Sequence, residues 1–167
     1  MNDNDEVENY IDIDYFGVIN EQMICHALYL IHFLQINLIS EILLENDISG
    51  IIISNTSESS REVLKDIQKH QKGGLSGKPI EKKSNILINK FYNLFKGKIK
   101  IIGVGGIDSG QSAYEKFLLG ADYLQLYTGM VFQGPNIAGS IKKELKELLI
   151  RDGVKNFTEI IGNKTLS

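Results

Sequence analysis

The chain has 167 residues, and its 18 Lys and Arg residues against 21 Asp and Glu residues give a formal net charge of −3. A hydrophobic content of 43% is typical of one core-forming domain, and the single cysteine excludes a disulfide scaffold because it has no partner within the chain. The mild acidity gives no reason to expect a polyanionic partner. Nucleic acid is therefore not predicted as a ligand.

Charge is unevenly distributed along the chain. Residues 1–14 carry six acids and no base, and we expect this segment to be a solvated tail without regular structure. Residues 61–100 carry eleven bases against three acids. Two interpretations of this basic stretch stay open: a solvated face, or a surface that attracts phosphate or acidic ligands.

The N-terminus shows no targeting signal, because such a signal needs a basic start followed by an apolar stretch or an Arg-rich amphipathic pattern. The longest apolar stretch, residues 24–44, has about the length of a membrane span but contains polar and titratable residues. The alternative is a buried helix whose last part packs onto a neighbouring strand. That part contains Ile39, Ile42, Leu43 and Leu44.

Three strands are predicted after residue 50. Residues 51–53 are consecutive isoleucines, a pattern typical of a strand that is covered on both faces in a parallel sheet. Residues 99–104 and 122–127 give the second and third strands.

Helices are predicted after each of these strands. The first covers residues 84–97 with Ser84 as its N-cap, the second covers residues 108–120 from Asp108 or Ser109, and the third covers residues 137–153. Lys116 lies on the second helix, and we expect its replacement by alanine to have little effect on ligand binding.

Alternating strands and helices imply right-handed crossovers and a parallel sheet, either doubly wound or barrel-like. Each strand is followed by polar or glycine residues, namely Ser54-Asn55-Thr56, Gly105-Gly106 and Tyr127-Thr128-Gly129. A (β/α)8 barrel places its chemistry directly after the strands and holds phosphate in its late loops. The pattern therefore predicts an α/β fold that forms the C-terminal portion, about three βα units, of a TIM barrel.

Three groups of residues are candidate ligand contacts. Gly105 and Gly106 allow backbone N–H groups to approach a phosphate, although a Gly-Gly turn can serve the backbone alone. Ser76 and Gly77 belong to a second glycine-rich segment, for which a flexible surface loop is the alternative. The amide and hydroxyl of residues 55–56 suit the edges of a small polar substrate, unless they form a helix cap or an Asx turn.

Five segments in order resemble the C-terminal part of the dihydroorotate dehydrogenase family. They are residues 51–56 (Ile-Ile-Ile-Ser-Asn-Thr), 73–79 (Gly-Gly-Leu-Ser-Gly-Lys-Pro), 101–107 (Ile-Ile-Gly-Val-Gly-Gly-Ile), 109–111 (Ser-Gly-Gln) and 125–135 (Gln-Leu-Tyr-Thr-Gly-Met-Val-Phe-Gln-Gly-Pro). The similarity extends over roughly residues 38–162. Gly77 followed at once by Lys78-Pro79 is similar to the class 2, quinone-using branch.

The resemblance implies an oxidoreductase that uses FMN to oxidise dihydroorotate to orotate in pyrimidine synthesis. It further implies ubiquinone as electron acceptor and a location at the mitochondrial inner membrane, and it implies no metal. Asn55 and Thr56 match the substrate-binding pair of the family. The residues that match or adjoin the family's FMN contacts are Ser54, Ser76, Gly77, Gly105, Gly106, Tyr127 and Thr128.

The family's N-terminal half has no counterpart in this chain. That half supplies the serine general base and a lysine beside the flavin, so no catalytic residue is expected among these 167. We expect residues 1–37 to be an atypical segment and residues 38–167 a partial FMN-binding barrel domain, with the N-terminal half of the barrel as a partner. Two other hypotheses stay open: a non-catalytic flavin- or phosphate-binding half barrel that works with a partner chain, and an unrelated phosphate-binding barrel enzyme.

Overall fold

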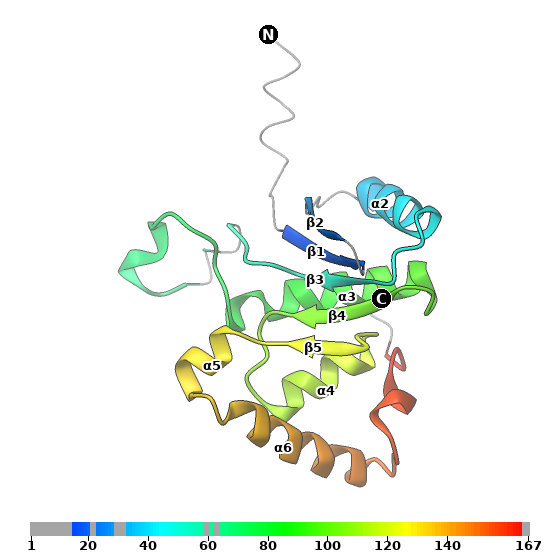
Figure 1. The fold of residues 1–167 in the computed structure, drawn as a ribbon. Coiled ribbons are helices and arrows are strands. Elements are labelled where there is room, and N and C mark those ends of the chain that lie inside the picture. The colour runs from blue at the N-terminus through cyan, green and yellow to red at the C-terminus, as the bar shows by residue number, and fades with distance from the viewer. Residues whose placement is uncertain (1–14, 21–22, 29–32, 59–60, 62–63, 165–167) are drawn as a thin grey trace.

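A five-stranded sheet in the order β2-β1-β3-β4-β5 forms the centre of the molecule (Figure 1). The computed structural model describes residues 15–20, 23–28, 33–58, 61 and 64–164. The strands are β1 (Tyr15–Asn20), β2 (Met23–Leu28), β3 (Gly50–Ile53), β4 (Lys100–Val104) and β5 (Tyr123–Gln125).

The parallel part of the sheet consists of β3, β4 and β5, with Ile52 opposite Ile102 and Ile102 opposite Tyr123. Helix α3 (Glu81–Phe95) connects β3 to β4, α4 (Gly110–Leu118) connects β4 to β5, and α6 (Ile137–Arg151) follows. This arrangement confirms the predicted α/β fold, a portion of a barrel with about three βα units. The remaining helical segments are α2 (Phe33–Glu45), η2 (Ile67–His70), η3 (Lys78–Ile80), α5 (Thr128–Gln133) and η4 (Phe157–Ile160).

The N-terminal part of the described chain is a hairpin that joins this sheet. β1 pairs antiparallel with β2 and with β3, where Gly17 lies opposite Ile52. The predicted helix over residues 24–44 is therefore wrong in its first part, which forms β2. No helix in the described part of the chain is both long and apolar enough to cross a membrane. The predicted acidic tail lies outside the described residues, and the predicted division after residue 37 falls within α2.

Helix α2 confirms the second part of that prediction. Ile36 and Leu43 lie in the same buried cluster as Ile51 of β3, and Ile39 and Leu44 pack against it. Ile42 was expected to pack there too, but half of its surface is exposed.

Only one face of the parallel strands is deeply buried. Ile51 and Ile53 are 1% and 0% exposed, whereas Ile52 between them is half-buried. Ile101 and Ile102 differ in the same way, because successive side chains point to opposite faces. The buried face packs against α3, whose Phe91 and Phe95 have no exposed surface. The expectation that residues 51–53 are covered on both faces is therefore wrong for the described part of the chain.

Two of the predicted helix starts differ in outcome. α3 begins three residues before Ser84, directly after η3 with its proline, so Ser84 lies inside the helix and is not its cap. α4 confirms Ser109 as N-cap: its side chain accepts a hydrogen bond from the backbone N–H of Ser112, and the Ser112 hydroxyl accepts one from the N–H of Ser109.

Candidate functional site

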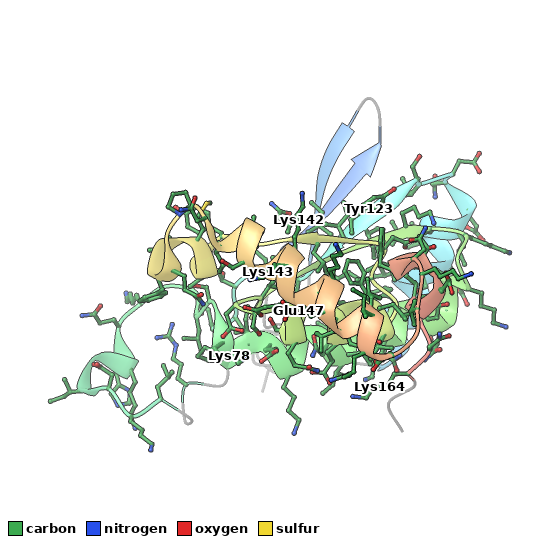
Figure 2. All side chains as sticks on the ribbon, turned by 90° about the horizontal axis from the view of Figure 1, so that it is seen from below. Lys78, Tyr123, Lys142, Lys143, Glu147 and Lys164 are labelled. Atoms are coloured by element: carbon green, nitrogen blue, oxygen red, sulfur yellow. The ribbon has the colours of Figure 1, made fainter. Side chains whose placement is uncertain are left out.

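A cleft of about 770 Å³ lies at the carboxyl end of the parallel strands. All but one of the candidate ligand contacts line it: Asn55, Thr56, Ser76, Gly77, Gly105, Gly106, Tyr127 and Thr128. The exception is Ser54, which is only 6% exposed and whose backbone N–H donates to Val104 O at 3.4 Å. Figure 2 shows Lys78 at this end of the molecule and Tyr123 and Lys164 at the other.

The loop that carries Ser76 and Gly77 is fastened to its surroundings. Ser57 and Leu75 exchange backbone hydrogen bonds of 2.9 and 2.7 Å, and the Thr128 hydroxyl donates to the Ser76 hydroxyl at 3.0 Å. The Arg61 guanidinium donates to backbone carbonyls along the same loop, those of Glu58, Lys69, Gln71 and Gly73. These contacts place the loop against the ends of β3 and α5.

Two glycines in the cleft wall have no room for a side chain. A Cβ atom at Gly106 would lie 2.3 Å from Cβ of Glu81, and the φ angle of Gly106 is 76°, in the left-handed region. A Cβ atom at Gly77 would lie 2.8 Å from Cγ2 of Thr128. Bare backbone therefore forms this part of the wall, as a site for phosphate requires. The nearby hydroxyls of Ser76 and Thr128 add further hydrogen-bonding groups.

Asn55 and Thr56 form the part of the cleft that follows β3. The Asn55 side-chain oxygen accepts a hydrogen bond of 2.7 Å from the backbone N–H of Thr56. This bond leaves the two N–H donors of the Asn55 amide without an acceptor among the described residues. Both side chains line the cleft, so the amide is available to a carbonyl or carboxylate of a ligand.

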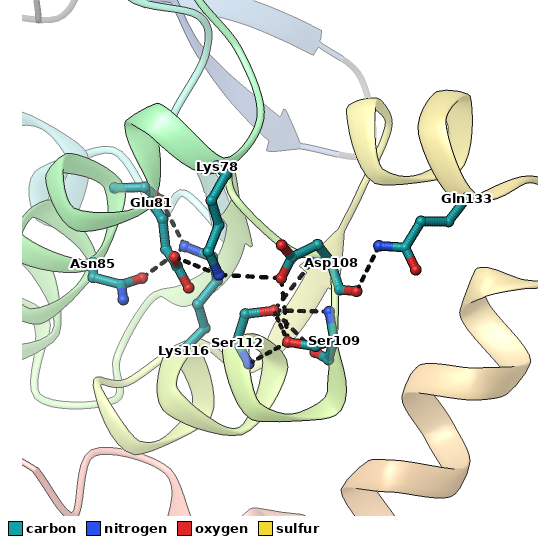
Figure 3. Close-up of polar contacts among 9 residues, drawn as sticks. Lys78, Glu81, Asn85, Asp108, Ser109, Ser112, Lys116 and Gln133 are labelled. Carbon is teal, nitrogen blue, oxygen red and sulfur yellow. Dashed lines mark hydrogen bonds and ion pairs between the residues drawn. The ribbon is translucent and has the colours of Figure 1, made fainter. Parts of the chain in front are cut away.

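A cluster of three charged side chains lies in the cleft wall between η3 and the start of α4 (Figure 3). The Lys78 ammonium lies 2.8 Å from a carboxylate oxygen of Glu81 and 3.2 Å from one of Asp108. Burial lowers the pKa of Lys78, but its hydrogen bonds to Glu81 and Asp108 outweigh that effect and hold the pKa above its ordinary value. The Gln133 amide also reaches this corner, donating to Asp108 O at 2.9 Å.

Lys116 of α4 lies beneath the same wall and has no exposed surface. Its Nζ donates to the Ser84 hydroxyl at 3.0 Å and to the Asn85 side-chain oxygen at 2.7 Å. The Ser84 hydroxyl in turn donates to Val104 O at the end of β4. Burial lowers the pKa of Lys116 to about 7. The expectation that its replacement has little effect on ligand binding is not tested by these contacts.

The lysines of the basic stretch at residues 61–100 differ in their surroundings. Lys82, Lys90 and Lys96 face solvent, as expected for a solvated face. Lys78 lines the cleft, but its ammonium is paired with the carboxylates of Glu81 and Asp108, so the attraction of an acidic ligand stays a prediction.

Several residues that line the cleft were not selected from the sequence: Lys78, Asp108, Gln125, Phe132 and Gln133. Lys78 lies in η3 after the glycine-rich loop, and Phe132 and Gln133 lie on α5, whereas Asp108 and Gln125 lie at or shortly after the carboxyl end of a strand. That position was the available signal for these two residues, because the ends of parallel strands meet at one edge of a sheet.

Comparison with known proteins identifies the family. The sequence model described as Dihydroorotate dehydrogenase matches residues 30–149. The enzyme named dihydroorotate dehydrogenase (quinone) from Deinococcus radiodurans is 42% identical over 114 residues, which cover 68% of this chain and 31% of that protein. The mitochondrial enzyme of the same name from Mus musculus is 43% identical over 124 residues, covering 74% and 31%.

Solved structures agree with the sequence comparisons. The ligand-free dihydroorotate dehydrogenase of Eimeria tenella superimposes with a TM-score of 0.77 at 33% identity, covering 80% of this chain and 37% of that one. The same enzyme in complex with ferulenol gives a TM-score of 0.74 at 34% identity, covering 77% and 34%. The chain thus spans about a third of the length of the curated relatives that it matches. On these matches, the chain belongs to the dihydroorotate dehydrogenase family.

Proposed function

We propose that this chain forms the C-terminal wall of an FMN and dihydroorotate site in a quinone-dependent dihydroorotate dehydrogenase. One observation carries the proposal. Residues selected separately from the ends of three strands, and from the loop at residues 73–77, line a single cleft at the carboxyl end of the sheet. A cleft of about 770 Å³ lies within the range of cofactor and substrate sites.

The FMN phosphate is assigned to the part of the cleft formed by Gly105, Gly106, Tyr127 and Thr128. Bare backbone at Gly106 and the Thr128 hydroxyl supply the groups that such a phosphate needs, and Lys78 offsets the carboxylates of Glu81 and Asp108 beside it. Ser76 and Gly77 are assigned to the rest of the cofactor. Ser54 lies behind the wall and supports the strand end.

Dihydroorotate is assigned to Asn55 and Thr56. The Asn55 amide donors orient a carbonyl or carboxylate of the substrate, and the Thr56 hydroxyl adds a second polar contact. When bound, FMN would supply the electron acceptor for the oxidation of dihydroorotate to orotate. The side chains of this wall hold the substrate in position for that transfer.

The rest of the reaction is assigned to residues outside this chain. The general base belongs to the N-terminal half of the barrel, which is the proposed partner, and ubiquinone is the proposed acceptor. The relatives from Mus musculus and Arabidopsis thaliana carry the word mitochondrial in their names. The inner mitochondrial membrane is the proposed location of the assembled enzyme.

The test measures FMN binding and turnover separately. FMN fluorescence reports binding to the purified 167-residue chain, and dihydroorotate-dependent reduction of a quinone dye reports turnover. The chain alone, with FMN added, should show no turnover above free FMN, since loss of a general base costs about 10²- to 10⁴-fold and half of the cofactor site is lacking. Adding the N-terminal half of the mouse relative as a separate polypeptide should restore turnover.

Each alternative outcome has its own meaning. FMN binding without turnover, even with the added half, would favour the non-catalytic half barrel. Absence of FMN binding in both preparations would contradict the proposal. In the restored enzyme, Asn55→Ala should weaken dihydroorotate binding and leave flavin content intact, and simultaneous loss of flavin would make Asn55 a structural residue.

A further inference from the structure

The buried amine of Lys116 takes no part in the roles proposed above. We infer that Lys116 is a positioning residue whose protonation and the binding of a phosphate group at the Gly105-Gly106 loop favour each other. The inference deepens the proposed function and depends on it, because it concerns the same part of the cleft.

Two hydrogen bonds connect the amine to the backbone that enters this loop. Figure 3 shows the amine of Lys116 beside Asn85, its other partner. Nζ of Lys116 donates to the Ser84 hydroxyl, and that hydroxyl donates to Val104 O, directly before Gly105. Ser84 also packs beneath the loop, since a Cβ atom at Gly105 would lie 3.4 Å from Cβ of Ser84. A change at the amine therefore reaches the loop over a short path in the protein interior.

The hydrogen-bond partners of Nζ suit a neutral amine. Within the described residues Nζ has two acceptors, on Ser84 and Asn85. A neutral amine has two N–H donors and an ammonium has three. A third donor without a partner is costly in the interior, so protonation of Lys116 requires an additional favourable interaction.

The surrounding charges indicate where that interaction comes from. Glu81 of α3 and Glu115 of α4 favour the protonated form, whereas Lys78 of η3 disfavours it. Glu115 is already paired with Lys164 at 2.9 Å. Lys78, Glu81 and Asp108 form a connected group with one cation and two carboxylates.

The net charge of this group links the protonation of Lys116 to the binding of a phosphate. With Lys116 neutral, the group has an excess negative charge that opposes a phosphate at the adjacent loop. With Lys116 protonated, cations and carboxylates balance. A phosphate must then raise the proton affinity of Lys116 by the same factor by which protonation raises phosphate affinity. Because burial brings the pKa of Lys116 to about 7, this exchange falls near neutral pH.

Nuclear magnetic resonance of the full chain, labelled with ¹³C at the lysine Cε atoms, tests the inference. The Lys116 resonance is assigned by its loss in Lys116→Arg and Lys116→Met, and its titration midpoint is measured alone, with inorganic phosphate, with FMN and with riboflavin. FMN and phosphate should raise the midpoint by about one pH unit, the shift expected from a nearby opposite charge. Riboflavin is the matched control, because it lacks the phosphate and should leave the midpoint unchanged.

The affinity for FMN provides a second measurement. It should fall by about fivefold between pH 7 and 9 in the unaltered chain, as the same linkage requires for a group that is half protonated at pH 7. Lys116→Arg keeps a permanent cation, so it should retain FMN binding and lose this pH dependence. FMN that binds while the Lys116 midpoint stays fixed would overturn the inference and leave the proposed function standing. FMN that binds neither to this chain alone nor to the chain with the N-terminal half added would overturn both.

Discussion

The two faces of the parallel strands have different environments in this chain. On one face Ile51, Ile53 and Ile101 are at most 1% exposed and pack against the side chains of α3. On the other face Ile52 and Ile102 are half-buried, and Tyr123 beside Ile102 is 58% exposed. The same strands thus have one completed face and one that the described elements leave partly open.

The difference shows which part of a barrel this chain supplies. Helices that follow the strands complete the outer face locally, because each helix lies next to its own strands in sequence. The inner face of a barrel is completed by side chains from the other strands, which are remote in sequence. The hairpin of β1 and β2 also pairs with β3, so β3 is not an edge strand of the described sheet. The chain therefore completes its outer layer locally and leaves its inner face partly open, where the proposed N-terminal half would pack.

The largest effect is expected when two adjacent residues of β4, one on each face, are replaced by alanine. Ile101→Ala should lower the free energy of unfolding by about 2–5 kcal/mol, because it leaves a cavity in the buried cluster. Ile102→Ala should cost about 1 kcal/mol, because its side chain loses less buried surface. Urea unfolding followed by circular dichroism measures both values. Ile101→Val, with an expected cost of about 0.5–1.5 kcal/mol, serves if the alanine variant does not fold.

This contrast should change when the N-terminal half is supplied. Ile102→Ala should then cost more than in the chain alone, because the added strands bury the inner face. An unchanged cost in the complex would contradict the assignment of this face to the barrel interior.

The buried amine on the completed face makes stability depend on pH. Lys116 has a pKa of about 7 in the folded chain against an ordinary value of 10.5, so between these values the unfolded chain binds more protons. The free energy of unfolding should therefore rise with pH above about 7, by at most about 1.4 kcal/mol per pH unit. Urea unfolding at pH 6, 7, 8 and 9 measures the slope. Lys116→Met should flatten it, and an equal slope in both chains would show that another group is responsible.

The choice of this pH range separates Lys116 from other groups. Hydrogen bonds to Asp122 and Asp152 hold the pKa values of Lys100 and Tyr114 above their ordinary values. Their contributions are lost only as the pH rises beyond about 10, outside the measured range.

The strands and helices after residue 50 could be predicted because local signals agree there. Runs of isoleucine, a capping serine at Ser109 and glycines after the helices mark the elements within a few residues. The hairpin could not be predicted in this way. Residues 24–44 are apolar over a length that contains both β2 and α2, and such a run does not distinguish the strand period from the helix period.

The site was predicted from residues next to the strand ends, and its supporting layer was missed. Ser54 was assigned to the flavin, yet it lies behind the cleft wall, a distinction that depends on which way the chain turns after β3. Lys116 was not selected as a site residue, and lysine is rarely buried. Its spacing was the available signal: it follows Ser112 by four residues and Ala113 by three, and both are buried on the same side of α4.

A substitution at Asp122 tests the contact between β4 and β5 without changing the burial of either face of the sheet. One carboxylate oxygen accepts from the backbone N–H of Ile101 at 2.9 Å, and the other lies 2.7 Å from the Lys100 ammonium. Asp122→Ala removes this link between β4 and β5 and should cost about 1.5 kcal/mol, as expected for a hydrogen bond to a charged group. FMN affinity should stay unchanged, because Asp122 lies at the end of the strands opposite the cleft. A loss of FMN affinity in Asp122→Ala would contradict this separation.

The smallest effect on the free energy of unfolding is expected for Lys164→Ala, in the segment that packs against α3 and α4. The Lys164 ammonium pairs with Glu115 at 2.9 Å, and 46% of the lysine side chain is exposed. The backbone of the same residue makes two further bonds, from its N–H to Leu118 O at 2.9 Å and from the Asn89 amide to its carbonyl at 3.0 Å. Lys164→Ala keeps both backbone bonds and removes only an exposed ion pair, so it should cost less than about 0.5 kcal/mol. Asn89→Ala is the matched variant, because it removes a bond between the helix and this segment in a buried position and should cost more. Urea unfolding in low and in high salt compares the two. If Lys164→Ala proved the costlier change, and the cost disappeared in high salt, surface charge and not backbone bonding would hold the segment against the outer layer.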